Sequence, residues 1–238
     1  MVVRVLAKIT LRGLLGRRRF LLLFPLPVLL VVAAIIGRAS GADPAKWADP
    51  VLTQIGFGVV LPLIAMIVGT GVLGSELEDG SAVTLLTTPV PRGTIVLTKL
   101  GVAIGVTTLA TAVPMFVAGI LVDSVRLGIG LAVGAFVGSV AYSALFVALS
   151  VISRRPVLIA IGYLVLWETT LANLLDGVRW LSIRQFAVTT SDWVASTDLV
   201  TSRLPAVYAV LATIVLATAA ATLAIDRLSA FSVRGETG

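Results

Sequence analysis

Six long runs of apolar residues set the strongest limit on how this chain can fold. They cover residues 20–37, 51–74, 95–122, 127–152, 157–175 and 205–225 and contain at most one charged side chain each. An α-helix rises 1.5 Å per residue, so runs of about 18–28 residues can cross a hydrocarbon core about 30 Å thick. We therefore expect an all-α polytopic membrane protein with six transmembrane helices. The first two spans would be joined by a short polar loop at residues 38–50.

The composition agrees with a membrane protein and excludes several kinds of chemistry. Hydrophobic residues make up 58% of the 238 residues and charged residues only 13%, against about 45–50% and about 25% in soluble domains. The chain has no His and no Cys, which excludes imidazole or thiolate metal sites, disulfides and Ser-His or Cys-His nucleophiles. None of Lys8, Lys46 and Lys99 follows a glycine, as a phosphate-loop lysine must. We expect one transmembrane domain over residues 1–238, with no catalytic residue, metal site or ATP site.

The distribution of basic residues predicts the orientation in the membrane. With six spans and an inner amino terminus, 12 of the 18 Lys and Arg lie on the cytoplasmic side: Arg4, Lys8, Arg12, Arg17, Arg18, Arg19, Arg92, Lys99, Arg154, Arg155, Arg227 and Arg234. The other six lie outside: Arg38, Lys46, Arg126, Arg179, Arg184 and Arg203. Cytoplasmic loops carry an excess of basic residues. We therefore expect both termini to be cytoplasmic.

The first 19 residues favour an amphipathic helix that lies in the membrane interface. The basic residues recur every four positions, at Arg4, Lys8 and Arg12. On a helix, the opposite face would carry Val2, Leu6 and Ile9. Such a helix places its apolar face at the acyl boundary and its basic face near anionic headgroups. A disordered basic tail that only sets the topology is the alternative.

Residues 75–92, between the second and third spans, carry the most specific pattern. Ser75 followed three residues later by Glu78 is a capping-box signature, which predicts the start of a short helix. Glu76, Glu78 and Asp79 would stand where the helix dipole favours negative charge. Leu85 and Leu86 would then form an apolar ridge. Prolines at positions 89 and 91, just before Arg92, would end the helix.

This segment resembles the ABC-2 type transporter permeases, the membrane-spanning subunits of ABC exporters. The matching residues are Gly74, Glu76, Glu78, Gly80, Ser81, Leu85, Leu86, Pro89, Val90, Arg92 and Lys99. The resemblance implies that the segment is a cytoplasmic coupling helix that docks into a separate ATPase subunit, which would bind ATP and Mg²⁺. Ser75, Glu76, Glu78, Asp79, Leu85, Leu86 and Arg92 would make or shape that contact. A capped cytoplasmic loop with no partner is the alternative interpretation.

Glycines at a spacing of four residues predict close helix packing within the membrane. Gly130, Gly134 and Gly138 have this spacing in the fourth span, and Gly101 and Gly105 have it in the third. Lipid gives no hydrophobic drive for association, so small residues that let backbones approach favour packing. Packing within the chain is the simpler use of these glycines, and a dimer seam is the alternative.

Glu168 is the acid that falls inside a predicted span, the fifth. An ionisable group at such a depth costs at least about 3 kcal/mol unless it is neutralised, paired or hydrated. Three roles fit it: a polar ligand in a substrate cavity, a proton-binding carboxyl, or a structural acid bonded to Thr169, Thr170 or a neighbouring helix.

The outer segment 176–204 is too apolar and aromatic for a simple loop. Aromatic residues collect at membrane interfaces, so its composition predicts an interfacial or re-entrant segment. The resemblance implies short helices here that gate the exit.

These features together favour the permease subunit of an ATP-driven exporter in a cell membrane of bacterial type. It would work as a homodimer or with a related permease. A path lined mainly by Val, Leu, Ala and Thr suits an amphipathic drug, antibiotic, lipid or peptide, because it lacks the fixed charge of an ion-selective pore. An ion-coupled carrier that uses Glu168 is the first alternative. The second is an integral membrane lipid transferase, because Asp176 to Arg179 resembles a fragment of a phosphatidyltransferase signature.

Overall fold

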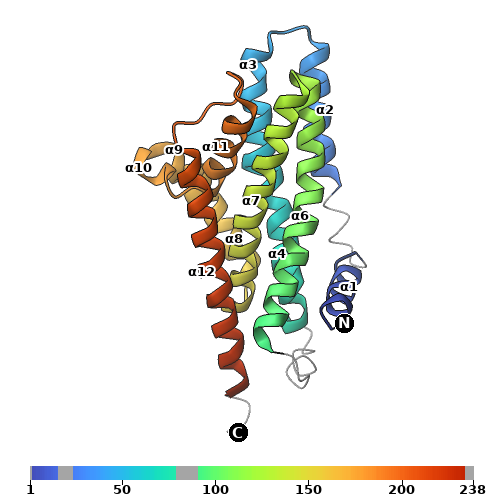
Figure 1. Cartoon of the computed structure of the whole chain (residues 1–238), viewed down its shortest axis with the longest axis vertical. Helices are drawn as coiled ribbons and strands as arrows, with labels where there is room; N and C mark the ends of the chain where they lie inside the picture. The colour runs from blue at the N-terminus through green and yellow to red at the C-terminus, as the bar shows by residue number, and fades with distance from the viewer. Residues whose placement is uncertain (1, 16–23, 79–90, 234–238) are drawn as a thin grey trace.

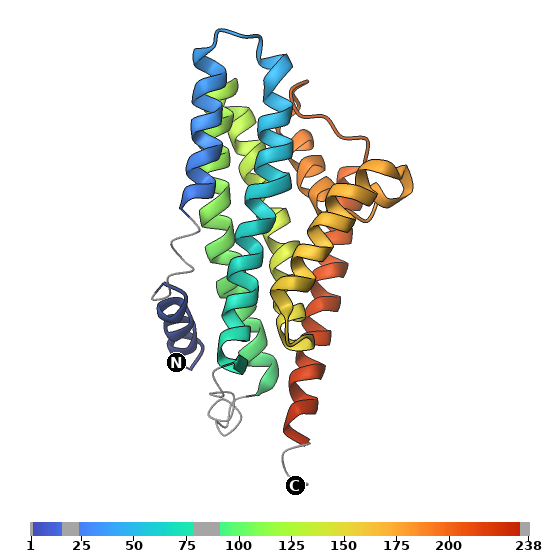
Figure 2. The same cartoon turned by 180° about the vertical axis from the view of Figure 1, so that it is seen from behind.

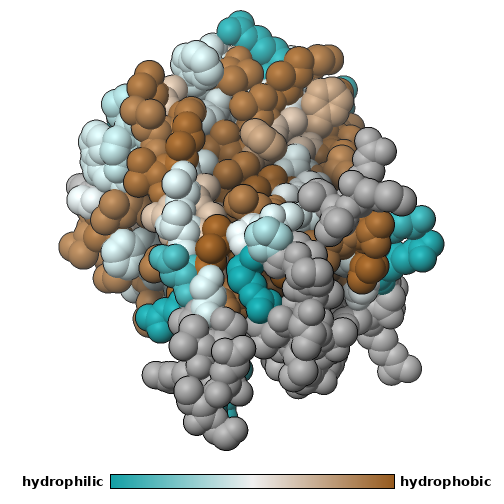
Figure 3. All heavy atoms as spheres, turned by 60° about the horizontal axis from the view of Figure 1, so that its bottom comes forward, coloured by the Kyte–Doolittle hydropathy of each residue, from teal (hydrophilic) through white to brown (hydrophobic). Residues whose placement is uncertain are grey.

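The computed structural model describes residues 2–15, 24–78 and 91–233, and every regular element in these ranges is a helix. The helices form an elongated bundle (Figure 1). The amino-terminal helix α1 (Val2–Leu15) and the end of the last helix, α12 (Ala206–Val233), lie at the same end (Figures 1 and 2). Large apolar side chains cover much of the outer surface (Figure 3), as expected for a bundle surrounded by lipid. The predicted all-α membrane class is confirmed.

In the described part of the chain, four helices are long and apolar enough to cross a membrane: Pro44–Leu73, Arg92–Val122, Val125–Ile152 and Ala206–Ser229. Two more apolar helices, Pro25–Ala39 and Pro156–Leu171, are shorter. At 1.5 Å per residue they reach only about 23–24 Å, less than the hydrocarbon core. A multi-pass membrane protein is thus supported, while the number of six spans stays a prediction.

The polar loop predicted at residues 38–50 is wrong for most of its length. Helix α2 (Pro25–Ala39) continues to residue 39, and α3 (Pro44–Asp49) already begins at residue 44. Asp43 caps α3: its carboxylate accepts a hydrogen bond from the amide of Ala45 at 3.1 Å, and Pro44 occupies the first helical position. From α3 the chain continues through η2 (Pro50–Val60) into α4 (Leu61–Glu78) as one rod.

Two π-helical stretches interrupt the α-helical pattern. They are η2 and η3 (Tyr163–Leu171), the second of which follows α8 (Pro156–Gly162). In η3 the hydroxyl of Thr170 donates to the carbonyl of Val165, five residues earlier, at 2.8 Å. A π-helix has a wider turn than an α-helix and changes which side chains face a neighbour.

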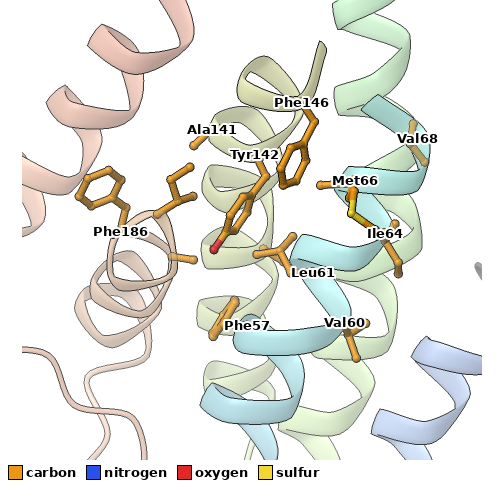
Figure 4. Close-up of a cluster of buried hydrophobic side chains, with 14 of the residues drawn as sticks. Phe57, Val60, Leu61, Ile64, Met66, Val68, Ala141, Tyr142, Phe146 and Phe186 are labelled. Carbon is orange, nitrogen blue, oxygen red and sulfur yellow. The ribbon is translucent and has the colours of Figure 1, made fainter. Parts of the chain in front are cut away.

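The central helix of the bundle is α7 (Val125–Ile152), which packs against α4, α6 (Arg92–Val122), α11 (Ile183–Ala195) and α12. Its side chains Tyr142 and Phe146 meet Phe57 and Leu61 of the rod in a buried cluster (Figure 4). The rings of Tyr142 and Phe146 are stacked, with centroids 5.8 Å apart.

A buried polar seam joins α6 to α7. The hydroxyl oxygens of Thr111 and Ser139 lie 3.3 Å apart, and Ser143 donates to Thr107 at 3.4 Å. All four side chains are buried. Hydrogen bonds between helices satisfy these hydroxyls where lipid could not.

Helix α11 packs closely on α7 at the three glycines spaced by four residues. A Cβ added at Gly130 would lie 2.6 Å from the Cβ of Ala195, and one at Gly138 would lie 3.2 Å from that of Ala187. At Gly134 an added Cβ would overlap the Ser191 hydroxyl and the Ala187 carbonyl. These glycines therefore let the two backbones approach. Gly101 and Gly105, by contrast, have no atom within 4 Å of such a Cβ and lie on the exposed side of α6.

We expect Gly134→Ala to reduce stability by about 1–3 kcal/mol, because the added methyl group overpacks the contact with α11. Thermal unfolding in uncharged detergent measures the change. Gly105→Ala is the matched control, because its methyl group meets open space. It should leave stability unchanged or raise it by up to about 1 kcal/mol through better helix propensity. Equal destabilisation by both substitutions would contradict the assigned packing.

Candidate functional site

Glu168 stands in η3 and is only 4% exposed. Three donors approach its carboxylate: the Tyr163 hydroxyl at 3.0 Å, the Ser182 hydroxyl at 2.5 Å and the backbone amide of Ile183 at 2.9 Å. The carboxylate is thus bonded within the chain by groups from its own helix and from the start of α11.

These bonds make Glu168 a cap for α11. Ser182 is the N-cap residue of this helix, and its hydroxyl also accepts from the amide of Gln185 at 3.3 Å. Helix amino termini have unpaired amides and a partial positive charge, so a carboxylate is stabilised there. The hydroxyls of Thr169 and Thr170, which the sequence suggested as partners of Glu168, donate to carbonyls of their own helix. The contacts favour the structural role among the three roles considered.

Lys99, the basic residue of the third predicted span, is fully buried. Its ammonium group donates to the carbonyl oxygen of Val72 at 3.0 Å. Val72 belongs to α4 and Lys99 to α6, so this bond joins the two helices that flank the predicted coupling segment.

Most of the predicted coupling helix lies outside the described residues, including Asp79, Leu85 and Leu86. Ser75, Glu76 and Glu78 belong to the last turns of α4. The prediction that Ser75 caps the start of a new helix is therefore wrong, because the backbone stays helical from Leu61 through this position. No proline interrupts the chain there, and a single glycine costs a helix only about 1 kcal/mol. Arg92 is the first residue of α6.

The end of α4 and the start of α6 lie at the same end of the bundle as α1 and the last turn of α12 (Figures 1 and 2). The segment that the sequence assigns to the ATPase contact is therefore attached at the end that carries both terminal helices. This arrangement agrees with an even number of membrane-crossing helices between the two termini.

The outer segment contains a residue that the sequence interpretation did not single out, Arg184. It is only 7% exposed, and its guanidinium donates to the Gln54 side-chain oxygen at 2.8 Å. The pattern Ser182-x-x-Gln185 is a capping-box signature that could have predicted the start of α11. No local signal could have paired Arg184 with a residue 130 positions away.

The sequence matches the family described as ABC-2 family transporter protein over residues 17–176, about two thirds of the chain. The chain belongs to the ABC-2 transporter family. The match includes the segment between α4 and α6 as well as Glu168, and it ends before α11. Permeases of the ABC-2 family generally pair with ABC ATPases. A comparison with curated proteins gave no significant match.

We predict that Glu168→Leu destabilises the protein by about 3 kcal/mol or more, because three buried or half-buried donors lose their acceptor. Glu168→Gln should cost less, since its amide oxygen can still accept from Ile183 and Tyr163. Thermal unfolding in detergent gives both values. Thr170→Val is the control, because this exposed hydroxyl bonds only within its own helix, and it should change stability by less than about 0.5 kcal/mol. Wild-type stability of Glu168→Leu would refute the capping role.

Proposed function

We propose that this chain is the membrane-spanning subunit of an ATP-driven exporter. Two copies, or this chain and a related permease, would enclose the transport path, and each would bind a separate ATPase subunit through residues 75–92. The observation that carries the proposal is the family match over residues 17–176, which includes this segment. ATP and Mg²⁺ would be bound by the partner, and the chain itself would carry out no bond chemistry.

The contact between Lys99 and Val72 supports a coupling role for the adjoining segment. It joins α4 to α6 about two turns before the end of the first helix and about two turns after the start of the second. A force applied to the segment by a closing ATPase would therefore move both helices together rather than only the loop. Alternating access then follows if the two arrangements of the helices differ in affinity for the ATP-bound partner.

We place the end that carries α1, the coupling segment and the end of α12 in the cytoplasm of a bacterial cell, on the basis of the basic-residue bias. Helix α1 supports this placement. Leu6, Thr10 and Leu14 face the bundle side, whereas Val5 and Ile9 are exposed beside Lys8 and Arg12. The prediction that Ile9 shares an apolar face with Leu6, opposite the basic residues, is therefore wrong. Apolar and basic side chains on one open face suit the boundary between acyl chains and anionic headgroups.

The proposed cargo is an amphipathic molecule such as a drug, antibiotic, lipid or peptide. Export of an antibiotic would give resistance to it. The ion-coupled carrier loses its main support, because the Glu168 carboxylate that it needed is occupied by three donors within the chain. No observation in the structure favours the lipid transferase.

Crosslinking tests the ATPase contact directly, because the chain has no native cysteine. We expect Glu78→Cys, coexpressed with an ABC ATPase of the same organism that carries a surface cysteine and treated with a short bifunctional thiol reagent, to form a crosslinked pair with that ATPase. Trp193→Cys is the control: its side chain is exposed, but on α11, away from the end that carries α1. It should give no such product.

Charge reversal gives a functional readout for the same contact. Glu78→Lys should leave the chain folded and inserted but reduce ATP-dependent transport in reconstituted vesicles by at least about tenfold, the effect of losing about 1.4 kcal/mol of interaction. Transport at the parental rate, together with absence of the crosslink, would refute the assigned docking segment.

A further inference from the structure

A partly open cavity with mixed polar and apolar walls lies in the half of the bundle away from the terminal helices. It has two adjoining parts, with volumes of about 510 and 210 Å³, which share the lining residues Arg179, Gln185 and Thr201. Its walls come from the short helix α10 (Asp176–Arg179), the start of α11, the rod at η2 and the residues that precede α12. Segments far apart in the sequence thus enclose one space.

Basic side chains are prominent among the described lining residues of this cavity. Arg179 and Arg203 line the larger part, and Arg179 and Arg184 line the smaller part. Among the lining residues whose side chains the structure describes, Asp49 is the one acid. Asp192, which lies close by on α11, accepts a hydrogen bond from the backbone amide of Ser202 at 2.8 Å and is not among the lining residues. Within this described part of the wall, basic side chains therefore outnumber acidic ones.

The deepest of these cations is held in a fixed position. Arg184 follows the capped start of α11, where Glu168 bonds Ser182 and Ile183, and its guanidinium contacts Gln54 of the rod. The guanidinium group of a buried arginine is planar and has several N–H donors, so it can form two parallel hydrogen bonds to a phosphate or carboxylate. Gln54, Gln185 and Thr201 add polar groups to the wall.

The surroundings of the cavity suit an amphipathic ligand. At its rim the rings of Trp180 and Tyr208 meet edge to face with centroids 5.1 Å apart, and the Tyr208 hydroxyl donates to the Trp180 carbonyl at 2.7 Å. Trp and Tyr mark the level of the lipid headgroups. Nearby on the outer surface, Leu181 and Val207 are 59% and 72% exposed. A phosphate in the cavity would thus lie beside a surface that can contact acyl chains.

We propose that this cavity binds the phosphate group of an amphipathic molecule, with Arg184 and Arg203 as its cationic contacts. The site would give the permease a means of selecting anionic headgroups at the end opposite the ATPase contact. The inference is independent of the coupling to ATP, because binding to the isolated chain needs no partner. Its failure and the failure of the exporter proposal can therefore be distinguished.

Binding to the purified chain in a maltoside detergent tests the site, because this detergent carries no phosphate. Dihexanoyl phosphatidic acid is the lipid probe, inorganic phosphate is the free anion, and dihexanoylglycerol is the matched lipid without phosphate. Titration calorimetry should show binding of phosphatidic acid and none of dihexanoylglycerol. If inorganic phosphate binds as well, the site recognises the phosphate itself. If phosphatidic acid alone binds, the acyl chains are needed too.

Variants connect that binding to the cavity. Arg203 is exposed, so Arg203→Gln should leave the fold intact while weakening binding of phosphatidic acid by about tenfold, as expected for the loss of one charge-assisted bond. Arg203→Glu should abolish it. Arg154→Gln, which removes an exposed charge at the other end of the bundle, is the control and should bind with parental affinity. No binding of either phosphate probe, or full affinity in Arg203→Glu, would overturn the proposal.

Discussion

The close approach of α11 to α7 is the contact on which the half of the bundle away from the terminal helices depends. Water provides no drive for helix association inside a membrane, so contact must come from close packing and hydrogen bonds. Gly130, Gly134 and Gly138 allow that contact because a side chain at any of them would overlap α11 or the rod. Helix α11 has 13 residues, about 20 Å, and is too short to cross the membrane alone. Its position is therefore defined by α7 along its length and by Glu168 at its start.

Polar groups inside the bundle divide into two kinds. The hydroxyls of Thr107, Thr111, Ser139 and Ser143 bond one another, Lys99 bonds a helix carbonyl, and Glu168 bonds three donors. Groups of this kind stabilise the arrangement of the helices, and their presence in a span is poor support for a transport site. The cavity beside α11 is different, because three arginines and one acid are its charged lining residues in the part of the chain that the structure describes. An imbalance of charge in a space large enough for a ligand is the stronger functional signal.

The sequence predicted the helical class, the central part of each long helix and the family, since all three follow from local composition and spacing. The predictions from sequence failed where a helix continues through an apparent boundary and where the bonded residues are far apart in the sequence. Residues 38–50 were interpreted as a polar loop, although α2 continues to residue 39 and Asp43 and Pro44 start a new helix. Ser75 was interpreted as a cap, although α4 simply continues through it.

The partners of Glu168 show the same limit. Thr169 and Thr170 are adjacent in sequence, but in a π-helix their hydroxyls reach back five residues to carbonyls of η3. Of the three groups that bond the carboxylate, Tyr163 lies in the same helix, whereas Ser182 and Ile183 follow 14 and 15 residues later, after the chain turns into α11. Only the tertiary fold could supply these last two.

The rod from Pro44 to Glu78 connects the two regions to which function is assigned. At one end its side chains Asp49, Thr53 and Gln54 line the cavity, and Gln54 contacts Arg184. At the other end its last turns lead into the coupling segment, and Val72 is tied to α6 through Lys99. About 24 residues of helix, or about 35 Å, separate Gln54 from Glu78. The rod and α11 both pack against α7, so the contact between Gln54 and Arg184 lies between two helices that share one central neighbour. The position of Arg184 in the cavity wall therefore depends on the packing of both helices against α7, as well as on the cap at the start of α11.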